Sequence, residues 1–218
     1  MSHDIEYSTA DSKHALAYLG SGGGGLTDRQ EDNLEFMRSI ARGSQRGLDA
    51  QGIDWGVTIP DALEHLVAGR TDYSGAPYAG CAYVRALQIV IGRTGSDPVQ
   101  MGTYSAPATF FGLMDEDMQR LGVPAHLLPH RFLYGGPPVE FPVLPCPPDG
   151  YPAIGHLPLA HAKPAADAYR TVLHRMDPDY QADAQELITL LDDEHEEWED
   201  ATKRLDWYTA DSLFFQLT

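Results

Sequence analysis

The sequence has 218 residues, 43% of them hydrophobic, and a formal net charge of −17. Its length and hydrophobic content suit one folded domain with a single core and argue against disorder of the whole chain. The excess of carboxylates makes binding to nucleic acid unlikely to be its function, because phosphate recognition relies on clustered lysine and arginine. The N-terminus does not resemble a secretion signal, and no apolar run reaches the roughly 18 residues of a membrane-spanning helix. We therefore expect a single domain over residues 1–218 in the cytoplasm.

The first 25 residues are expected to lie at the periphery of that domain. Asp11 can cap a short helix that runs through Leu19, and the glycine run at residues 20–25 must then be a loop, because consecutive glycines lose too much backbone entropy in a helix. The run also satisfies the glycine pattern of a dinucleotide-binding turn. Such a turn follows a strand, whereas the residues before this one favour a helix. We interpret the run as a mobile connection.

Helical patterns dominate the next part of the chain. Thr27 and Gln30 have the spacing of a capping box, and the helix that they begin should fray near Gly43 or Gly47. The helix expected over residues 78–91 is strongly apolar and should lie at the buried centre. Further helices are expected over residues 60–69 and 110–121, with turns over residues 92–102.

Ten prolines fall within residues 124–158. Proline breaks helices and removes sheet donors, so we expect an ordered wrap over the core with little regular structure, anchored by aromatic residues such as Phe132. A flexible linker is the alternative. The aromatic density of this segment also suggests a small-molecule pocket beneath it, lined by Tyr134, Tyr151 and His156.

The C-terminal part predicts a helix from Pro158 to about Met176, one or two helices over residues 180–208, and a strand over residues 211–218. From Asp177 onward the chain has 13 acidic residues against 2 basic ones, a local charge of −11. Such a run usually forms a solvated helix face, but it can also attract a basic protein. The candidate residues for binding a basic partner are Asp192, Asp193, Glu196, Glu197, Glu199 and Asp200.

No combination of residues predicts an active site, a bound metal or a cofactor. His126 and His130 have the four-residue spacing of a zinc pair, but Pro129 lies between them and interrupts the helix that would align them. His195 falls on the apolar stripe of the C-terminal helix, where a hydrogen-bonded core histidine is the commoner explanation and a titrating or catalytic role is the alternative. Whether the protein is an enzyme stays open.

Several short segments of the later part resemble the YfbM-like group, a bacterial domain of unknown function, and related actinobacterial proteins. They are the sequence LEHLVAG at residues 63–69, YPAIGHL at 151–157, the pair at 177–178, and Trp198 with Ala201. The group's tryptophan has no counterpart at Leu63, and the proline-rich segment is longer here. The resemblance implies helices packed around a small sheet and no established chemistry, and it is compatible with an immunity or antitoxin-like role.

We therefore expect an α+β fold that is predominantly helical, with helices packed around a small sheet and an ordered proline-rich wrap. Two functional hypotheses follow. The first is an acidic module that binds a basic partner protein. The second is a small-molecule-binding protein or enzyme with a pocket under the proline-rich segment, where His195 is a further candidate. The sequence does not predict the oligomeric state.

Overall fold

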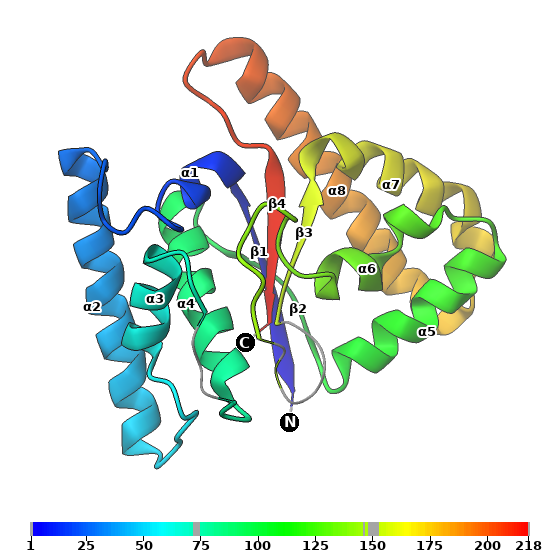
Figure 1. Ribbon diagram of the computed structural model, residues 1–218. Coiled ribbons are helices and arrows are strands. Elements are labelled where there is room, and N and C mark those ends of the chain that lie inside the picture. The colour runs from blue at the N-terminus through cyan, green and yellow to red at the C-terminus, as the bar shows by residue number, and fades with distance from the viewer. Residues whose placement is uncertain (1, 72–74, 146, 148–152, 218) are drawn as a thin grey trace.

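The computed structural model describes residues 2–71, 75–145, 147 and 153–217. It confirms a predominantly helical α+β fold, in which an antiparallel sheet stands between two layers of helices (Figure 1). The strand order in the sheet is β2-β1-β4-β3, so the two ends of the chain supply the central pair. The strands are β1 (His3–Ala10), β2 (Val99–Tyr104), β3 (Ile154–Pro158) and β4 (Ser212–Leu217).

The helices divide between the two faces of the sheet in chain order (Figure 1). One layer consists of α1 (Ser12–Leu16), α2 (Asp28–Ala50), α3 (Ile59–Val67) and α4 (Ala79–Thr94). The other consists of α5 (Pro107–Arg120), α6 (Pro129–Tyr134), α7 (Leu159–Val172) and α8 (Pro178–Arg204), with the short 3₁₀ turns η1 (Ala125–Leu127) and η2 (Leu173–Arg175).

Strand β4 explains why the protein has two cores. Successive side chains of a strand point to opposite faces of the sheet. Leu213 and Phe215 accordingly pack among the helices α5 to α8, whereas Phe214 packs among α1 to α4, and all three are fully buried. The apolar tail predicted as a strand is therefore buried on both faces at the centre of the molecule.

The N-terminal residues are not peripheral in the structure. β1 pairs with β2 on one side and with β4 on the other, and Ile5 is fully buried. Asp11 caps α1 as predicted, although the helix is shorter than expected. The glycine run is not a loose connection either, because the Gly20 amide donates to the Leu66 carbonyl at the end of α3 over 2.9 Å.

Two further expectations about the first half are corrected. The capping box of Thr27 and Gln30 is confirmed, but α2 continues without interruption through Gly43 and Gly47 to its end at Ala50. Neither glycine would bring an added Cβ closer than 3.8 Å to a neighbour, so nothing there forces the helix to end. Part of the segment expected as turns, residues 92–102, belongs instead to β2, an edge strand of the sheet.

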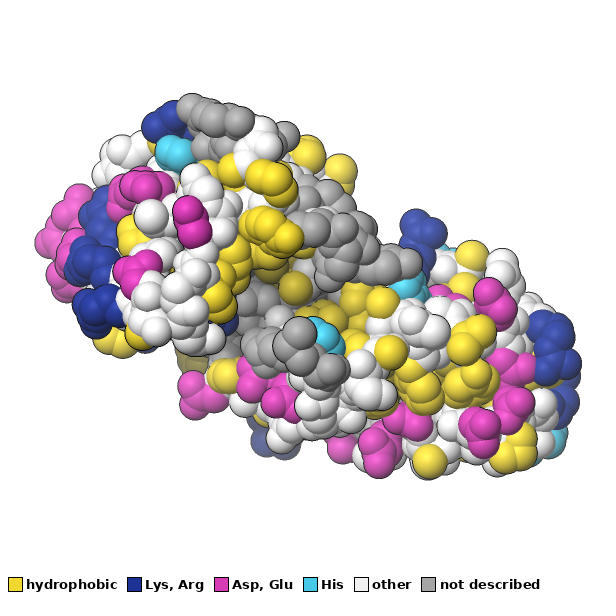
Figure 2. Space-filling view, turned by 90° about the horizontal axis from the view of Figure 1, so that it is seen from below, with side chains coloured by type: hydrophobic (Ala, Val, Ile, Leu, Met, Phe, Trp, Pro, Cys, Tyr) yellow, Lys and Arg dark blue, Asp and Glu magenta, His cyan; other side chains and the backbone are white. Residues whose placement is uncertain are grey.

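The described part of the proline-rich segment is ordered and more regular than expected. Pro129 occupies the first turn of α6, where its missing amide hydrogen costs nothing, and Phe132 and Phe141 are buried. α6 lies directly on β3 at Gly155, where an added Cβ would come within 2.0 Å of the Phe132 carbonyl oxygen. Seen from below, the two helical layers form separate lobes with hydrophobic side chains gathered between them (Figure 2).

Candidate functional site: an acidic pocket between the sheet and α8

The acidic residues predicted as a partner surface lie on α8, but half of them already have basic partners. Asp192 contacts Lys163 and Arg170 of α7, which packs alongside. Glu199 forms an ion pair with Lys203 at 2.8 Å. Asp200 forms one with Arg204 at 2.9 Å. These three carboxylates are neutralised within the protein, which leaves Asp193, Glu196 and Glu197 of the predicted set.

Five acids of α8, including Asp193 and Glu197 of the predicted set, lie toward β1 and β2. The carboxylates of Asp183, Glu186 and Asp193 line a pocket there, and those of Glu194 and Glu197 act on Tyr7 of β1. We call these five residues the sheet-facing acids. No Lys, Arg or His in the part of the chain that the structure describes forms an ion pair with any of them.

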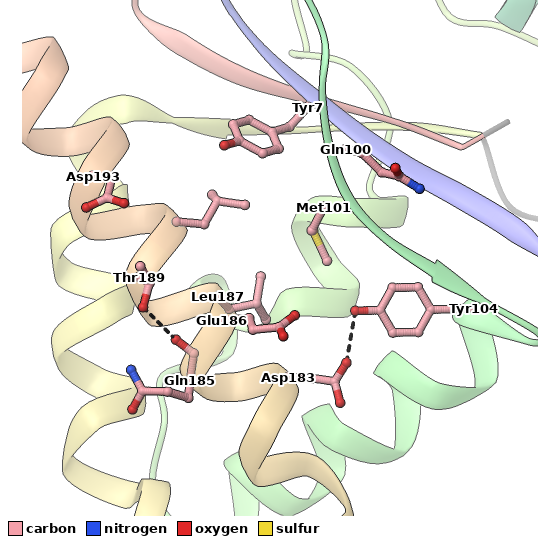
Figure 3. Close-up of a pocket in the computed structure, with 11 residues that line it drawn as sticks. Tyr7, Gln100, Met101, Tyr104, Asp183, Gln185, Glu186, Leu187, Thr189 and Asp193 are labelled. Carbon is pink, nitrogen blue, oxygen red and sulfur yellow. Dashed lines mark hydrogen bonds between the residues drawn. The ribbon is translucent and has the colours of Figure 1, made fainter.

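The pocket has a volume of about 320 Å³ and lies under the exposed edge of the sheet (Figure 3). Tyr7 comes from β1 and Tyr104 from β2, and Glu186 and Asp183 point from α8 toward Tyr104. The Tyr104 hydroxyl donates a hydrogen bond to Oδ1 of Asp183 over 3.0 Å. The other described lining residues are Gln100, Met101, Gln185, Leu187, Thr189, Leu190 and Asp193. All charged residues in this lining are therefore carboxylates.

Burial and the negative charge of the sheet-facing acids raise the pKa values of neighbouring groups. Burial and the carboxylates of Glu194, Glu197 and Asp193 raise the pKa of Tyr7 to about 12. Burial and the charge of Glu197 likewise raise the pKa of Glu194. Burial, followed by the charge of Asp183, raises the pKa of Tyr104. Both tyrosines stay protonated at neutral pH and present neutral rings to the pocket.

Carboxylates beside aromatic rings form a chemical environment that suits a cation. An ammonium or guanidinium group gains charge-assisted hydrogen bonds from carboxylate oxygens and a further attraction from the face of a tyrosine ring. It would also reduce the repulsion among the acids. The hydroxyl groups of the same lining are not activated as nucleophiles, since Thr189 donates its hydroxyl hydrogen to the Gln185 carbonyl and the pKa values of Tyr7 and Tyr104 are raised. The pocket is therefore better suited to binding a cation than to covalent catalysis.

The described residues predicted to line a pocket beneath the proline-rich segment have contacts within the protein, and none of them lines the acidic pocket. Tyr134 is buried, and its ring stacks on His130. His156 donates from Nδ1 to the Gly136 carbonyl over 2.9 Å. His195 lies on α8 with Nδ1 at 3.4 Å from the Leu159 carbonyl oxygen, which is a weak structural contact. Tyr151 lies outside the described residues.

The histidines do not form a metal site in the described ranges. His126 belongs to η1 and His130 to α6, so the pair does not share a helix, and the ring of His126 lies instead near that of His161. No group of three or more His, Cys, Asp or Glu suited to a metal ion occurs in the part of the chain that the structure covers. No described helix is long and apolar enough to cross a membrane.

Comparison with known protein families shows which family the chain belongs to. A family described as Domain of unknown function (DUF7691) matches residues 1–216. The chain belongs to the DUF7691 family. No curated protein and no solved structure matches this DUF7691 chain. The resemblance to the YfbM-like group is not part of these findings and stays a prediction.

Sequence reasoning found only one member of the pocket lining, Asp193. Asp183 and Glu186 are three residues apart on α8, a spacing that places them on one helix face and that could have identified them. Tyr7 and Tyr104 carry no such signal, because their place in the pocket depends on the pairing of β1 with β2 across almost 100 residues of sequence.

Proposed function

We propose that this DUF7691 protein binds a positively charged segment of a partner protein at the acidic pocket and along the sheet-facing acids. The observation that carries the proposal is the charge of the pocket lining. Its described charged residues, Asp183, Glu186 and Asp193, are all carboxylates, and none has a basic partner within the described chain. Other acids of the same helix, such as Asp192 and Glu199, do have such partners.

The extent of the acidic surface favours a protein segment over a small free cation. The sheet-facing acids span positions 183 to 197 of one helix, which corresponds to about 21 Å along its axis. The pocket occupies only part of that length. A Lys-rich or Arg-rich segment could place one side chain in the pocket and others along the helix, and the charge complementarity would accelerate its association. Neutralisation of a basic toxin by an immunity or antitoxin-like protein is one setting for such binding.

The test compares two double variants of α8 that remove the same total charge. Glu186→Gln with Asp193→Asn removes two of the three carboxylates of the pocket, whereas Glu199→Gln with Asp200→Asn neutralises acids that already have basic partners. Each protein is titrated with a synthetic decalysine peptide by calorimetry at low and at moderate salt. We expect the pocket variant to bind roughly tenfold more weakly than the matched variant, in line with the loss of charge-assisted hydrogen bonds.

Salt provides the second readout of the same experiment. Binding should weaken as the salt concentration rises, because surface charges are screened over about 10 Å at 0.1 M salt. Equal weakening in both double variants would contradict the proposal, since it would show that decalysine responds only to net charge. A decaglutamate peptide serves as the negative control and should not bind.

A further inference from the structure

A second, larger cavity lies beyond the C-terminal end of α8. It has a volume of about 780 Å³ and is formed by the end of β1, α1, the start of α2, the end of α4 and residues 207–210, which lead into β4. This volume lies within the range of small-molecule sites, about 300 to 1,000 Å³. The cavity shares no lining residue with the acidic pocket.

The aromatic part of this cavity comes from the segment after α8. Trp207 lines it with 74% of its surface exposed, and Tyr208 lies beside it with its ring nearly edge-on. The indole ring of Trp207 is therefore accessible to a ligand that enters the cavity. Because the indole of Trp207 forms part of the lining, a planar molecule in the cavity could stack on it.

The charge of the lining is different from that of the acidic pocket. Arg29 and His14 are its basic residues, and Asp11 is its one described carboxylate. Asp11 already accepts from the backbone amides of Lys13 and His14, at 2.8 and 3.2 Å, as the cap of α1. In the described part of the chain, no acidic residue forms an ion pair with Arg29.

Most neutral polar groups of the lining are also engaged within the protein. Thr27 and Gln30 bond to each other in the capping box. The Asn33 oxygen accepts from Arg93 over 2.8 Å. The Ser96 hydroxyl accepts from the Thr9 amide over 3.0 Å. The guanidinium group of Arg29 is thus the strongest donor left for a ligand, and it favours an anionic group.

We infer that this cavity binds a small aromatic molecule that carries one anionic group, with its ring on Trp207 and its anion at Arg29. The inference stands independently of the proposed partner site, because the two sites share no residue and prefer opposite charges. No described residue of the proline-rich segment lines this cavity.

The test uses matched ligands on the full-length protein. Indole-3-acetate and the neutral indole-3-acetamide have nearly the same shape and differ in charge, and phenyl phosphate and 4-hydroxybenzoate extend the panel of anions. Binding is measured by calorimetry and by the shift in unfolding temperature. We expect at least one aromatic anion to bind, and indole-3-acetate to bind roughly tenfold more tightly than the amide.

Three variants assign the binding to this cavity. Arg29→Gln should weaken binding of the anion about tenfold while leaving the amide unaffected, and Trp207→Ala should abolish binding that Trp207→Phe largely retains. Arg42→Gln, which removes another exposed arginine from α2, is the control and should not change the affinity. The inference is overturned if no aromatic anion in the panel binds at millimolar concentration or if indole-3-acetate and indole-3-acetamide bind equally. It is also overturned if Arg29→Gln and Arg42→Gln have the same effect on the affinity for the anion.

Discussion

Asp115 of α5 is a partly buried carboxylate that contacts the start of α6, and its ionisation should make stability depend on pH. Its Oδ1 accepts from the His130 amide over 3.0 Å, and burial raises its pKa from 3.8 to about 7. At pH values between 3.8 and about 7, the folded chain holds a proton on Asp115 that the unfolded chain releases. The contribution of Asp115 to stability is therefore largest at low pH and is lost as the pH rises through 7.

Asp115→Asn tests this effect, because asparagine keeps an oxygen for the His130 amide but does not ionise. The free energy of unfolding, measured by urea denaturation, should fall less between pH 5 and pH 8 in the variant than in the wild type. Asp32→Asn removes an exposed carboxylate from α2 and provides the control. A difference between Asp115→Asn and wild type that stays constant from pH 5 to pH 8 would show that Asp115 does not titrate in this range.

At the scale of the elements, two glycines should respond to the same substitution in opposite directions. An added Cβ at Gly155 of β3 would lie 2.0 and 2.4 Å from the carbonyl oxygens of Phe132 and Leu133, so Gly155→Ala must push α6 off the sheet. We expect this substitution to lower the free energy of unfolding by about 1 to 3 kcal/mol, the usual cost of overpacking. Gly47 lies inside α2 with nothing within 4 Å of an added Cβ.

Gly47→Ala should therefore stabilise the protein by up to about 1 kcal/mol, because alanine has the higher helix propensity. Chemical denaturation of both variants measures the two effects on one scale. If Gly47→Ala destabilised the protein, the uninterrupted α2 would be in doubt. If Gly155→Ala had no effect, the close contact of α6 with β3 would be in doubt.

The elements that the sequence predicted well are those that depend on neighbouring residues. The capping box of Thr27, the apolar helix α4 and the aromatic strand β4 all carry local signals, and all three are confirmed. β1 was not predicted, although Ile5 and Tyr7 alternate with polar residues over residues 4–8, because so short an alternation is a weak signal by itself. It becomes a central strand only by pairing with β4, more than 200 residues away.

The two cavities show why the candidate sites were harder to predict than the helices. The acidic pocket combines β1, β2 and α8, and the larger cavity combines the starts of α1 and α2 with the end of α4 and residues 207–210. The local signals in these segments, such as the capping box at the start of α2, indicate secondary structure and not a binding site. The acidity of α8 was evident from the sequence, but only the packing of α7 shows which carboxylates, such as Asp192, are neutralised.

The charge of the whole molecule leads to a last prediction about salt. A net charge of −17 on a folded chain creates repulsion that unfolding relieves, and the raised pKa of Glu194 shows this repulsion acting locally beside burial. Raising the NaCl concentration from 0.01 to 0.3 M reduces the screening length from about 30 Å to well under 10 Å. The unfolding temperature should therefore rise, even though salt also weakens exposed ion pairs such as Arg204 with Asp200, because such pairs contribute little. Calorimetric scans across this range measure the effect.

A variant with fewer carboxylates provides the comparison. Since removing two carboxylates from the pocket lessens the repulsion, the unfolding temperature of the Glu186→Gln, Asp193→Asn variant should rise less with salt than that of the wild type. A fall in the unfolding temperature of the wild type with salt would mean that ion pairs outweigh the repulsion.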